Sequence, residues 1–199
     1  MKDGDVVSHE HEGAGAEGRL DAQALFRAHA VFVASFLQRI GTPTADVDDL
    51  VQEVFLVVHR KGGYVPGPGR PRTWLAAIAL HVARTGRRTR GRRREQPDED
   101  ALLAVSSTST PDAELEARRA LARMQRALDG LDLEHRAAFV LYELDGESCE
   151  AIASAFGVPI GTVYSRLHHA RRRFTSAYAA LGDTEDGGAR MRTRLLGGT

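Results

Sequence analysis

The chain has 199 residues, of which 42% are hydrophobic and 27% charged, and its 27 basic residues balance 27 acidic ones. This composition is typical of a folded globular protein of one or two domains, and it excludes a fibre or a wholly disordered chain. No run approaches the ~20 apolar residues of a membrane-spanning helix, the N-terminus lacks the apolar centre of a signal peptide, and the single cysteine excludes an intrachain disulfide. We therefore expect a cytoplasmic protein with no membrane insertion and no structural metal.

The charges are sorted into blocks along the chain. Residues 84–94 hold seven arginines and no acid, whereas residues 95–116 hold seven acids and no base. A second basic run, 166–173, holds four arginines and two histidines. Two separate basic surfaces favour a polyanionic partner that touches the protein twice, because each neutralised phosphate releases counterions. On this pattern alone, a merely solvated arginine-rich surface is an open alternative.

The chain begins with a polar, acidic leader, 1–19, that we expect to be disordered. Apolar residues then recur at helical spacing over 21–40, and Gly41 and Pro43 end this first helix. The residues that recur at this spacing, and that make the helix amphipathic, are Leu25, Phe26, His29, Phe32, Val33, Phe36 and Leu37.

A second helix follows at once, with Thr44 or Asp46 as its predicted cap. One face forms an apolar stripe at the spacing of buried residues: Val47, Leu50, Val51, Val54, Phe55 and Val58. The opposite face is polar and carries Asp48, Asp49, Gln52 and Glu53.

Glycine and proline dominate residues 62–71, which therefore predict a loop. A third helix runs from about Arg72 into the arginine cluster, with Trp74, Leu75, Ile78 and Val82 facing inward. Residues 95–111 are acidic, rich in serine and threonine and bounded by prolines, which indicates a flexible linker between domains. We also expect this acidic linker to fold back on residues 84–94 and mask them.

The second half predicts helices over about 112–129, 133–145, 148–155 and 160–180, followed by a flexible tail, 181–199. No segment shows the alternating pattern of a β-strand. The fold class is therefore all-α, with two small helical domains (20–94 and 112–180) joined by the linker.

The pattern of residues 145–174 predicts a helix-turn-helix. Inward Ala151, Ile152 and Ala155 precede a tight turn in which Gly157 supplies a positive φ and Val158 fills the angle between the helices. The second helix, with Val163, Leu167, Ala170 and Phe174 inward, would enter the major groove of DNA. Its outward residues can read base edges or bind phosphate: Thr162, Tyr164, Ser165, Arg166, His168, His169, Arg171 and Arg172.

The string GESCEAIASAFGVPIGTVYSRLHHARRRF is similar to the second conserved domain of bacterial sigma factors of the extracytoplasmic-function group. DDLVQEVFLVVHR, residues 48–60, resembles the helix of this family that binds core RNA polymerase. PRTWLAAIALHVARTGRR, residues 71–88, resembles its promoter-melting helix. The resemblance covers about residues 20–94 and 113–178.

The resemblance implies a transcription initiation factor, not an enzyme, whose partners are core RNA polymerase and promoter DNA. Polymerase would bind Asp48, Asp49, Gln52 and Glu53, and the outward residues of the helix-turn-helix would read the minus-thirty-five element. The minus-ten element would be held by Arg70, Arg72, Trp74, His81, Arg84, Arg87 and Arg88. An anti-sigma factor is a further partner whose presence the sequence leaves open.

Four residues depart from the family pattern and bear on promoter sequence. His81 stands where asparagine is usual, and Thr85 where aspartate is usual. Tyr164 replaces a basic residue and His169 replaces an arginine.

Two other function classes compete with this interpretation. A stand-alone helix-turn-helix regulator that binds DNA as a dimer would have no need of the polar face at 48–53. A nuclease lacks its metal ligands, and no catalytic triad order or phosphate loop is present, so we expect no catalysis, cofactor or small-molecule substrate. We expect no metal at His9 and His11, and a packed Cys149 rather than a reactive thiolate.

Overall fold

The computed structural model describes the backbone of residues 18–67, 69–90 and 111–196, and it is all-α over these ranges, as predicted. The only pairing of extended backbone in the described ranges is an isolated bridge between Leu20 and Tyr64. The helices are α1 (Ala22–Arg39), α2 (Thr44–Arg60), α3 (Pro71–Arg90), α4 (Pro111–Asp129), α5 (Leu133–Phe139), the π-helical turn η1 (Val140–Leu144), α6 (Cys149–Phe156) and α7 (Ile160–Leu196).

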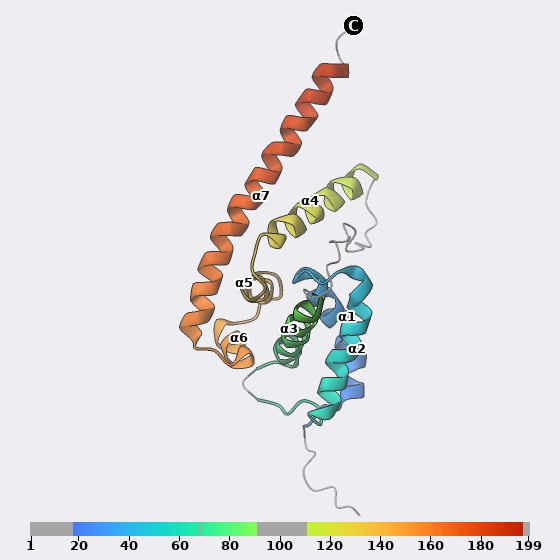
Figure 1. Ribbon diagram of the computed structural model, residues 1–199, viewed down its shortest axis with the longest axis vertical. Helices are drawn as coiled ribbons and strands as arrows, with labels where there is room; N and C mark the ends of the chain where they lie inside the picture. Colours follow the sequence, from blue (N-terminus) through green and yellow to red (C-terminus); the bar gives the residue numbers. More distant parts are fainter. Residues whose placement is uncertain (1–17, 68, 91–110, 197–199) are drawn as a thin grey trace, which may run out of the picture.

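The first three helices pack together as one unit, and their apolar stripes form its core (Figure 1). The predicted stripe of α2 is confirmed, because all six of its residues are buried. Of the residues that recur at helical spacing in α1, Phe26 is 46% exposed and His29 is half-buried, while Phe32 is half-buried and packs against the core. These side chains lie at the edge of the α1 stripe, whose buried centre is Leu25, Val33, Phe36 and Leu37.

The start of α2 also differs from its prediction. The N-cap is Pro43, which makes no side-chain cap hydrogen bond, and Thr44 is already helical. Proline suits this position because it has no N–H to leave unpaired and its fixed φ, here −55°, leads into a helix.

The helix-turn-helix is present in the second half of the molecule. Ser148 caps α6 by accepting a hydrogen bond from the Ala151 N–H, and Gly157 ends it in the left-handed region at φ 63° and ψ 37°. Val163, Leu167 and Ala170 of α7 are buried, as predicted, whereas Phe174 is half-buried against Phe139 at 4.8 Å between ring centroids. In α6 the buried residues are Cys149, Ile152 and Ala153, while the predicted Ala151 and Ala155 are half-buried.

Two helix boundaries depart from the sequence pattern. The helix predicted over 133–145 ends as α at Phe139 and continues as the π-helical turn η1, in which the Asp145 N–H donates to the Val140 carbonyl. Helix α7 continues to Leu196 and extends away from the body of the molecule, so most of the predicted tail is helical (Figure 1). The linker prediction for 95–111 lies outside the described residues, except that α4 already begins at Pro111.

The two helical units contact each other through α3, which packs against both α5 and α6 (Figure 1). Buried apolar residues of both units form one continuous core. The basic helix of the first unit therefore lies beside the helix-turn-helix unit, although a long segment separates them in sequence.

Candidate polymerase and promoter interfaces

The polar face of α2 is open to solvent. Asp48, Asp49, Gln52 and Glu53 are all exposed, and the opposite face of the same helix is committed to the core. Leu56, which the sequence analysis did not single out, is 54% exposed. It follows Gln52 by four residues and Glu53 by three, so it extends the same helical face by one turn. Leu56 therefore adds one apolar side chain to the exposed face that carries the acidic residues.

The loop that precedes α3 is fixed by an aromatic pair. The Tyr64 hydroxyl donates a hydrogen bond to the Gly69 carbonyl, and its ring lies 5.5 Å from the ring of Trp74. Backbone hydrogen bonds in both directions join Leu20 to Tyr64. Trp74 is half-buried and Arg70 is exposed, so the loop presents an aromatic edge and a cation together. Such a combination suits an unpaired DNA strand, because its bases stack on aromatic rings and its phosphates attract cations.

The predicted minus-ten residues of α3 divide into two kinds. His81, Arg84 and Arg87 are all exposed, and Arg87 in addition donates from one guanidinium nitrogen to the carbonyls of Ile40 and Gly41, at 2.8 and 3.0 Å. Burial lowers the pKa of Arg87, although Asp129 and Glu134 oppose this shift. Arg87 thus caps the end of α1, a role that the arginine run did not reveal. The Arg88 side chain lies outside the described residues.

Two of the predicted minus-ten arginines, Arg72 and Arg84, are paired with acids from the helix-turn-helix unit. Arg84 lies 2.8 Å from a carboxylate oxygen of Glu134, and Arg72 lies 3.6 Å from one of Asp145. Arg72 also covers the ring of Phe32 at 4.3 Å. No sequence signal indicated these pairs, because partners so far apart in the chain meet only through the packing of the two units.

The outer face of α7 carries the predicted minus-thirty-five residues. Tyr164, Ser165, His168, His169, Arg171 and Arg172 are exposed, and Thr162 and Arg166 are half-buried. Arg171 donates to Glu143 and lies over the ring of Tyr142, and the hydrogen bond to Glu143 is the main reason that its pKa is raised. His169 lies edge-on to His135 and to His168, at 6.1 and 5.7 Å between centroids. Arg171 is thus oriented by its own domain, while the residues around it face solvent.

Neither metal chemistry nor a reactive thiol finds support in the described residues. These residues contain no group of three or more histidine, cysteine, aspartate or glutamate side chains that could hold a metal ion. Cys149 is buried and burial raises its pKa, which disfavours a thiolate and agrees with the predicted packing role. Among the described helices, none is long and apolar enough to cross a membrane. His9 and His11 lie outside the described residues.

Two family models match the two units in order. Sigma-70 region 2 matches residues 25–93, and Sigma-70 region 4 matches residues 121–174. The chain is 34% identical over 147 residues to the ECF RNA polymerase sigma-E factor of Escherichia coli K12, covering 70% of this chain and 76% of that protein. It is 36% identical over 151 residues to the ECF RNA polymerase sigma factor SigE of Mycolicibacterium smegmatis, covering 75% of this chain and 58% of the relative.

Two solved structures share the fold. One is the sigma factor RpoE in complex with the anti-sigma factor NepR from Bartonella quintana, with 21% identity and a TM-score of 0.62 over 78% of this chain and 94% of that one. The other is CnrH in complex with the cytosolic domain of CnrY, with 26% identity and a TM-score of 0.54 over 80% of this chain and 88% of that one.

The two matched regions and the helix-turn-helix define the class: this is a sigma factor of the sigma-70 family, not an enzyme. Within that class, the chain belongs to the extracytoplasmic-function (ECF) sigma factors, which direct RNA polymerase to promoters. The family resemblance inferred from the sequence is thereby confirmed.

Proposed function

We propose that the chain binds core RNA polymerase through the polar face of α2 and carries it to promoters in the cytoplasm. The observation that carries this proposal is the solvent-open set Asp48, Asp49, Gln52 and Glu53 on a helix whose other face is buried. A partner can therefore use these side chains without disturbing the core. The domains that we assign are region 2 over 20–94 and region 4 over 112–180.

Promoter recognition divides between the two domains. In region 2, the loop and α3 hold the unpaired minus-ten strand, with His81 exposed on the helix surface where it can contact a base. The other minus-ten residues are Arg70, Arg72, Trp74, Arg84, Arg87 and Arg88. In region 4, the outer face of α7 reads the minus-thirty-five duplex in the major groove, from Thr162 through Arg172.

An anti-sigma factor is a further partner in this proposal. The two solved relatives named above were each captured with such a protein or with the cytosolic domain of a partner. The function needs no cofactor, metal or small-molecule substrate, because promoter recognition by side chains requires only protein and DNA.

The experiment is run-off transcription from a library of promoter sequences, with purified core polymerase and the full chain. We expect transcripts only when both proteins are present, and loss of these transcripts with the Asp49→Ala/Gln52→Ala/Glu53→Ala variant. The matched control is the exposed pair Glu116→Ala/Glu150→Ala, which removes two acids from region 4 and should remain active. Tight sequence-specific duplex binding by a dimer of the chain, without any effect of polymerase, would instead establish the stand-alone regulator.

A further inference from the structure

A small pocket lies beside α7, at the start of α5. Its volume is about 250 Å³, and its lining residues are Leu131, Asp132, His135, His169 and Arg173. Of these, only His169 belongs to the predicted minus-thirty-five residues. All five belong to region 4, so the pocket keeps its place beside α7 wherever this domain lies.

Imidazole rings from two helices meet at this pocket. The ring of His169 is edge-on to that of His135, with 6.1 Å between their centroids and 87° between their planes. His168 is a further edge-on neighbour of His169 at 5.7 Å, but it does not line the pocket. Because a hydrogen bond joins atoms about 3 Å apart, one small anion between His135 and His169 can contact both rings.

His135 has a buried nitrogen without a hydrogen-bond partner. Its Nδ1 atom makes no hydrogen bond to any described residue, and Oδ2 of Asp132 lies 3.7 Å away, too far for one. Buried polar atoms nearly always have partners, so this atom indicates a site whose partner is acquired. A neutral imidazole has one N–H donor and a protonated one has two. Protonation therefore lets His135 donate toward Asp132 and to a second anion at once.

The carboxylate of Asp132 is shared between Arg173 and His135. Its Oδ2 lies 3.7 Å from the Arg173 guanidinium as well as from the His135 ring. With both histidines of the pocket neutral, the charges of Arg173 and Asp132 cancel. With both protonated, the pocket has an excess of positive charge. Histidine is the side chain that changes charge between about pH 5 and 8, so the pocket comes to favour anions over this range.

The other charged groups packed around these histidines do not line the pocket. Within the described residues, the ionisable groups that face His135 and His169 are Asp132, Arg173 and His168. Neighbouring charges of α4, α5 and η1 are taken up by three ion pairs: Glu134 with Arg84, Arg136 with Asp129, and Glu143 with Arg171. The remaining charged neighbours on α6 and α7 are exposed Glu150 and Arg172 and half-buried Arg166. The charge of the pocket therefore depends on its own ionisable residues.

The spacing along α7 places this pocket at the level of the DNA backbone. Ser165, His169 and Arg173 are four residues apart and share one face of the helix. The N-terminal part of a recognition helix reads bases in a groove about 8.5 Å deep. Arg173 lies about 12 Å beyond Ser165 at ~1.5 Å per residue, so it lies above the groove floor, where the phosphates are.

We propose that this pocket binds a backbone phosphate of the minus-thirty-five duplex through His135, His169 and Arg173, and that protonation of the two histidines strengthens this contact. The proposal rests on the proposed function, because it needs the outer face of α7 to lie in the major groove. It assigns a DNA contact to α5, for which the sequence analysis predicted none. By linkage, a phosphate that favours the protonated pocket is itself bound more tightly as the pH falls.

The test measures binding of the full chain to a short fluorescent duplex of random sequence at pH 8.0 and 6.0, at one fixed salt concentration. Random sequence suffices because a phosphate contact carries no sequence information. Wild type should bind about fivefold more tightly at pH 6.0, a coupling of ordinary size between two binding events. The arginines of both domains stay charged throughout this range and contribute equally at both pH values.

Two variants and one control separate the two histidines from every other titrating group. His135→Gln/His169→Gln keeps polar side chains that take up no proton, so its affinity should change less than about twofold between the two pH values. His135→Lys/His169→Lys stays charged and should bind at pH 8.0 as tightly as wild type does at pH 6.0. The control His59→Gln removes an exposed histidine of α2 and should keep the full pH dependence. Circular dichroism checks that each variant retains its helix content.

A salt series on the holoenzyme distinguishes a phosphate contact from a base contact. At pH 6.0 the salt slope of promoter binding should be steeper by about one in wild type than in His135→Gln/His169→Gln, as for one further phosphate. The difference should be the same for every minus-thirty-five sequence, because each has the same backbone.

Three results would each overturn the phosphate site: equal pH dependence in wild type and the glutamine variant, no gain from the lysines at pH 8.0, or a pH effect confined to one minus-thirty-five sequence. Failure of the proposed function would look different. Run-off transcription would then be absent at every pH and with every variant, while binding to the random duplex would still distinguish the glutamine variant from the control.

Discussion

The outer face of α2 and the basic face of α3 belong to the same domain, and both are predicted partner surfaces, yet they differ in what occupies them. Asp49, Gln52 and Glu53 of α2 face solvent, whereas Arg72 and Arg84 of α3 are paired with acids of region 4. A pattern of charged residues on one helical face predicts a binding surface, but it does not show which charged groups the surface contacts. In this molecule the predicted polymerase surface faces solvent, and two arginines of the predicted DNA surface pair with acids of the same chain.

The largest expected effect comes from removing the polar side chains of α2, which tests whether this face binds polymerase. Asp49→Ala/Gln52→Ala/Glu53→Ala should weaken binding to core polymerase by tenfold or more, about 1.4 kcal/mol or above, because a few central residues carry most of an interface. The fold should persist, since alanine favours helix and these side chains are exposed. Binding would be measured by fluorescence anisotropy and helix content by circular dichroism. Unchanged affinity with intact helix content would contradict the assignment.

Two substitutions in α7 compare a predicted base contact, His168, with a predicted phosphate contact, Arg172. Loss of a base contact in His168→Ala should penalise the preferred minus-thirty-five element over its variants by roughly 1–3 kcal/mol. Arg172→Ala should weaken all sequences about equally and lower the salt slope by about one, as expected for a phosphate contact. Both would be measured on holoenzyme across a salt series. The reverse pattern would mean that α7 docks in a different rotation.

The substitution His81→Asn tests the open part of the α3 surface. His81 is exposed, and its ring can stack on a base or form hydrogen bonds that an asparagine would form differently. The substitution should change base preference at the minus-ten element while leaving minus-thirty-five binding unchanged. Sequencing of transcripts from a randomised minus-ten library would measure it, with the same substitution at the exposed His59 of α2, His59→Asn, as the control. Identical preferences in the wild type and the His81→Asn variant would remove this residue from recognition.

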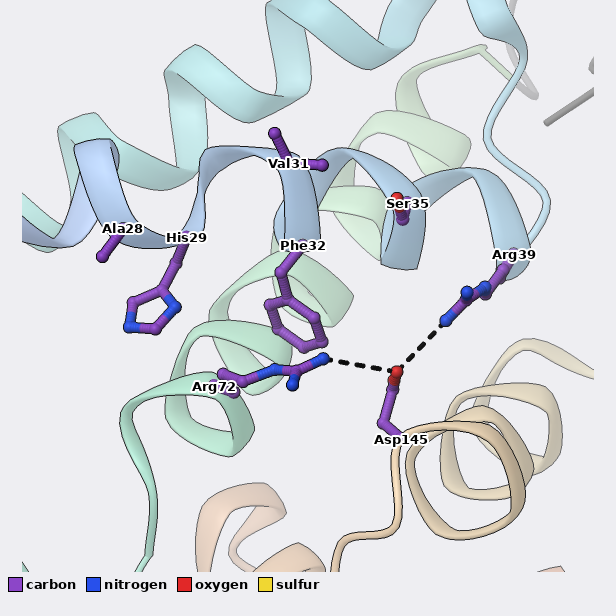
Figure 2. Close-up of a pocket in the computed structure, with 8 residues that line it drawn as sticks. All are labelled: Ala28, His29, Val31, Phe32, Ser35, Arg39, Arg72 and Asp145. Atoms are coloured by element: carbon purple, nitrogen blue, oxygen red, sulfur yellow. Dashed lines mark hydrogen bonds and ion pairs between the residues drawn. The ribbon is translucent and has the colours of Figure 1, made fainter. Parts of the chain in front are cut away.

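The smallest expected effect is a pH dependence from His29, which lines the groove of about 490 Å³ between α1 and Asp145 (Figure 2). Burial, and then the charge of Arg72, lower its pKa below 6.5. Protonation is therefore harder in the folded state, so the free energy of unfolding should decrease as pH falls through about 6.5 and level off below the folded pKa. Melting temperatures at pH 7.5 and 5.0 should differ less for His29→Gln than for wild type. An equal difference would exclude this contribution.

Local patterns predicted local structure well. The 3.6-residue spacing of apolar residues predicted the buried face of α2, and the glycine at the turn predicted the left-handed cap at Gly157. The positions of α1 that are less buried than the centre of its stripe have a local cause too. Phe26 and Phe32 are apolar residues at the edge of a stripe, and their spacing alone does not distinguish an edge position from the centre.

The ion pairs between the two helical units could not be predicted from the sequence. The acidic linker was predicted to mask the arginine cluster, and this segment lies outside the described residues. Within the described residues, Arg72 pairs with Asp145 and Arg84 pairs with Glu134, which the sequence did not predict. The π-helical turn η1 ends the helix at Leu144 and brings Asp145 into this position, and π-turns carry no clear sequence signal. The hydrogen bond from Arg87 to the Ile40 carbonyl at the end of α1 is another long-range contact that the sequence did not predict.

The most direct test of the account places spin labels at two exposed positions, Lys61→Cys and Ser176→Cys, in a Cys149→Ala background. The separation of the labels is measured in one sample before and after core polymerase and promoter DNA are added. The account predicts a short distance in the free chain and a distance several tens of ångströms longer in the promoter complex, because the two elements lie about 85 Å apart along the duplex. A free chain that is already extended, or a promoter complex that retains the short distance, would contradict it.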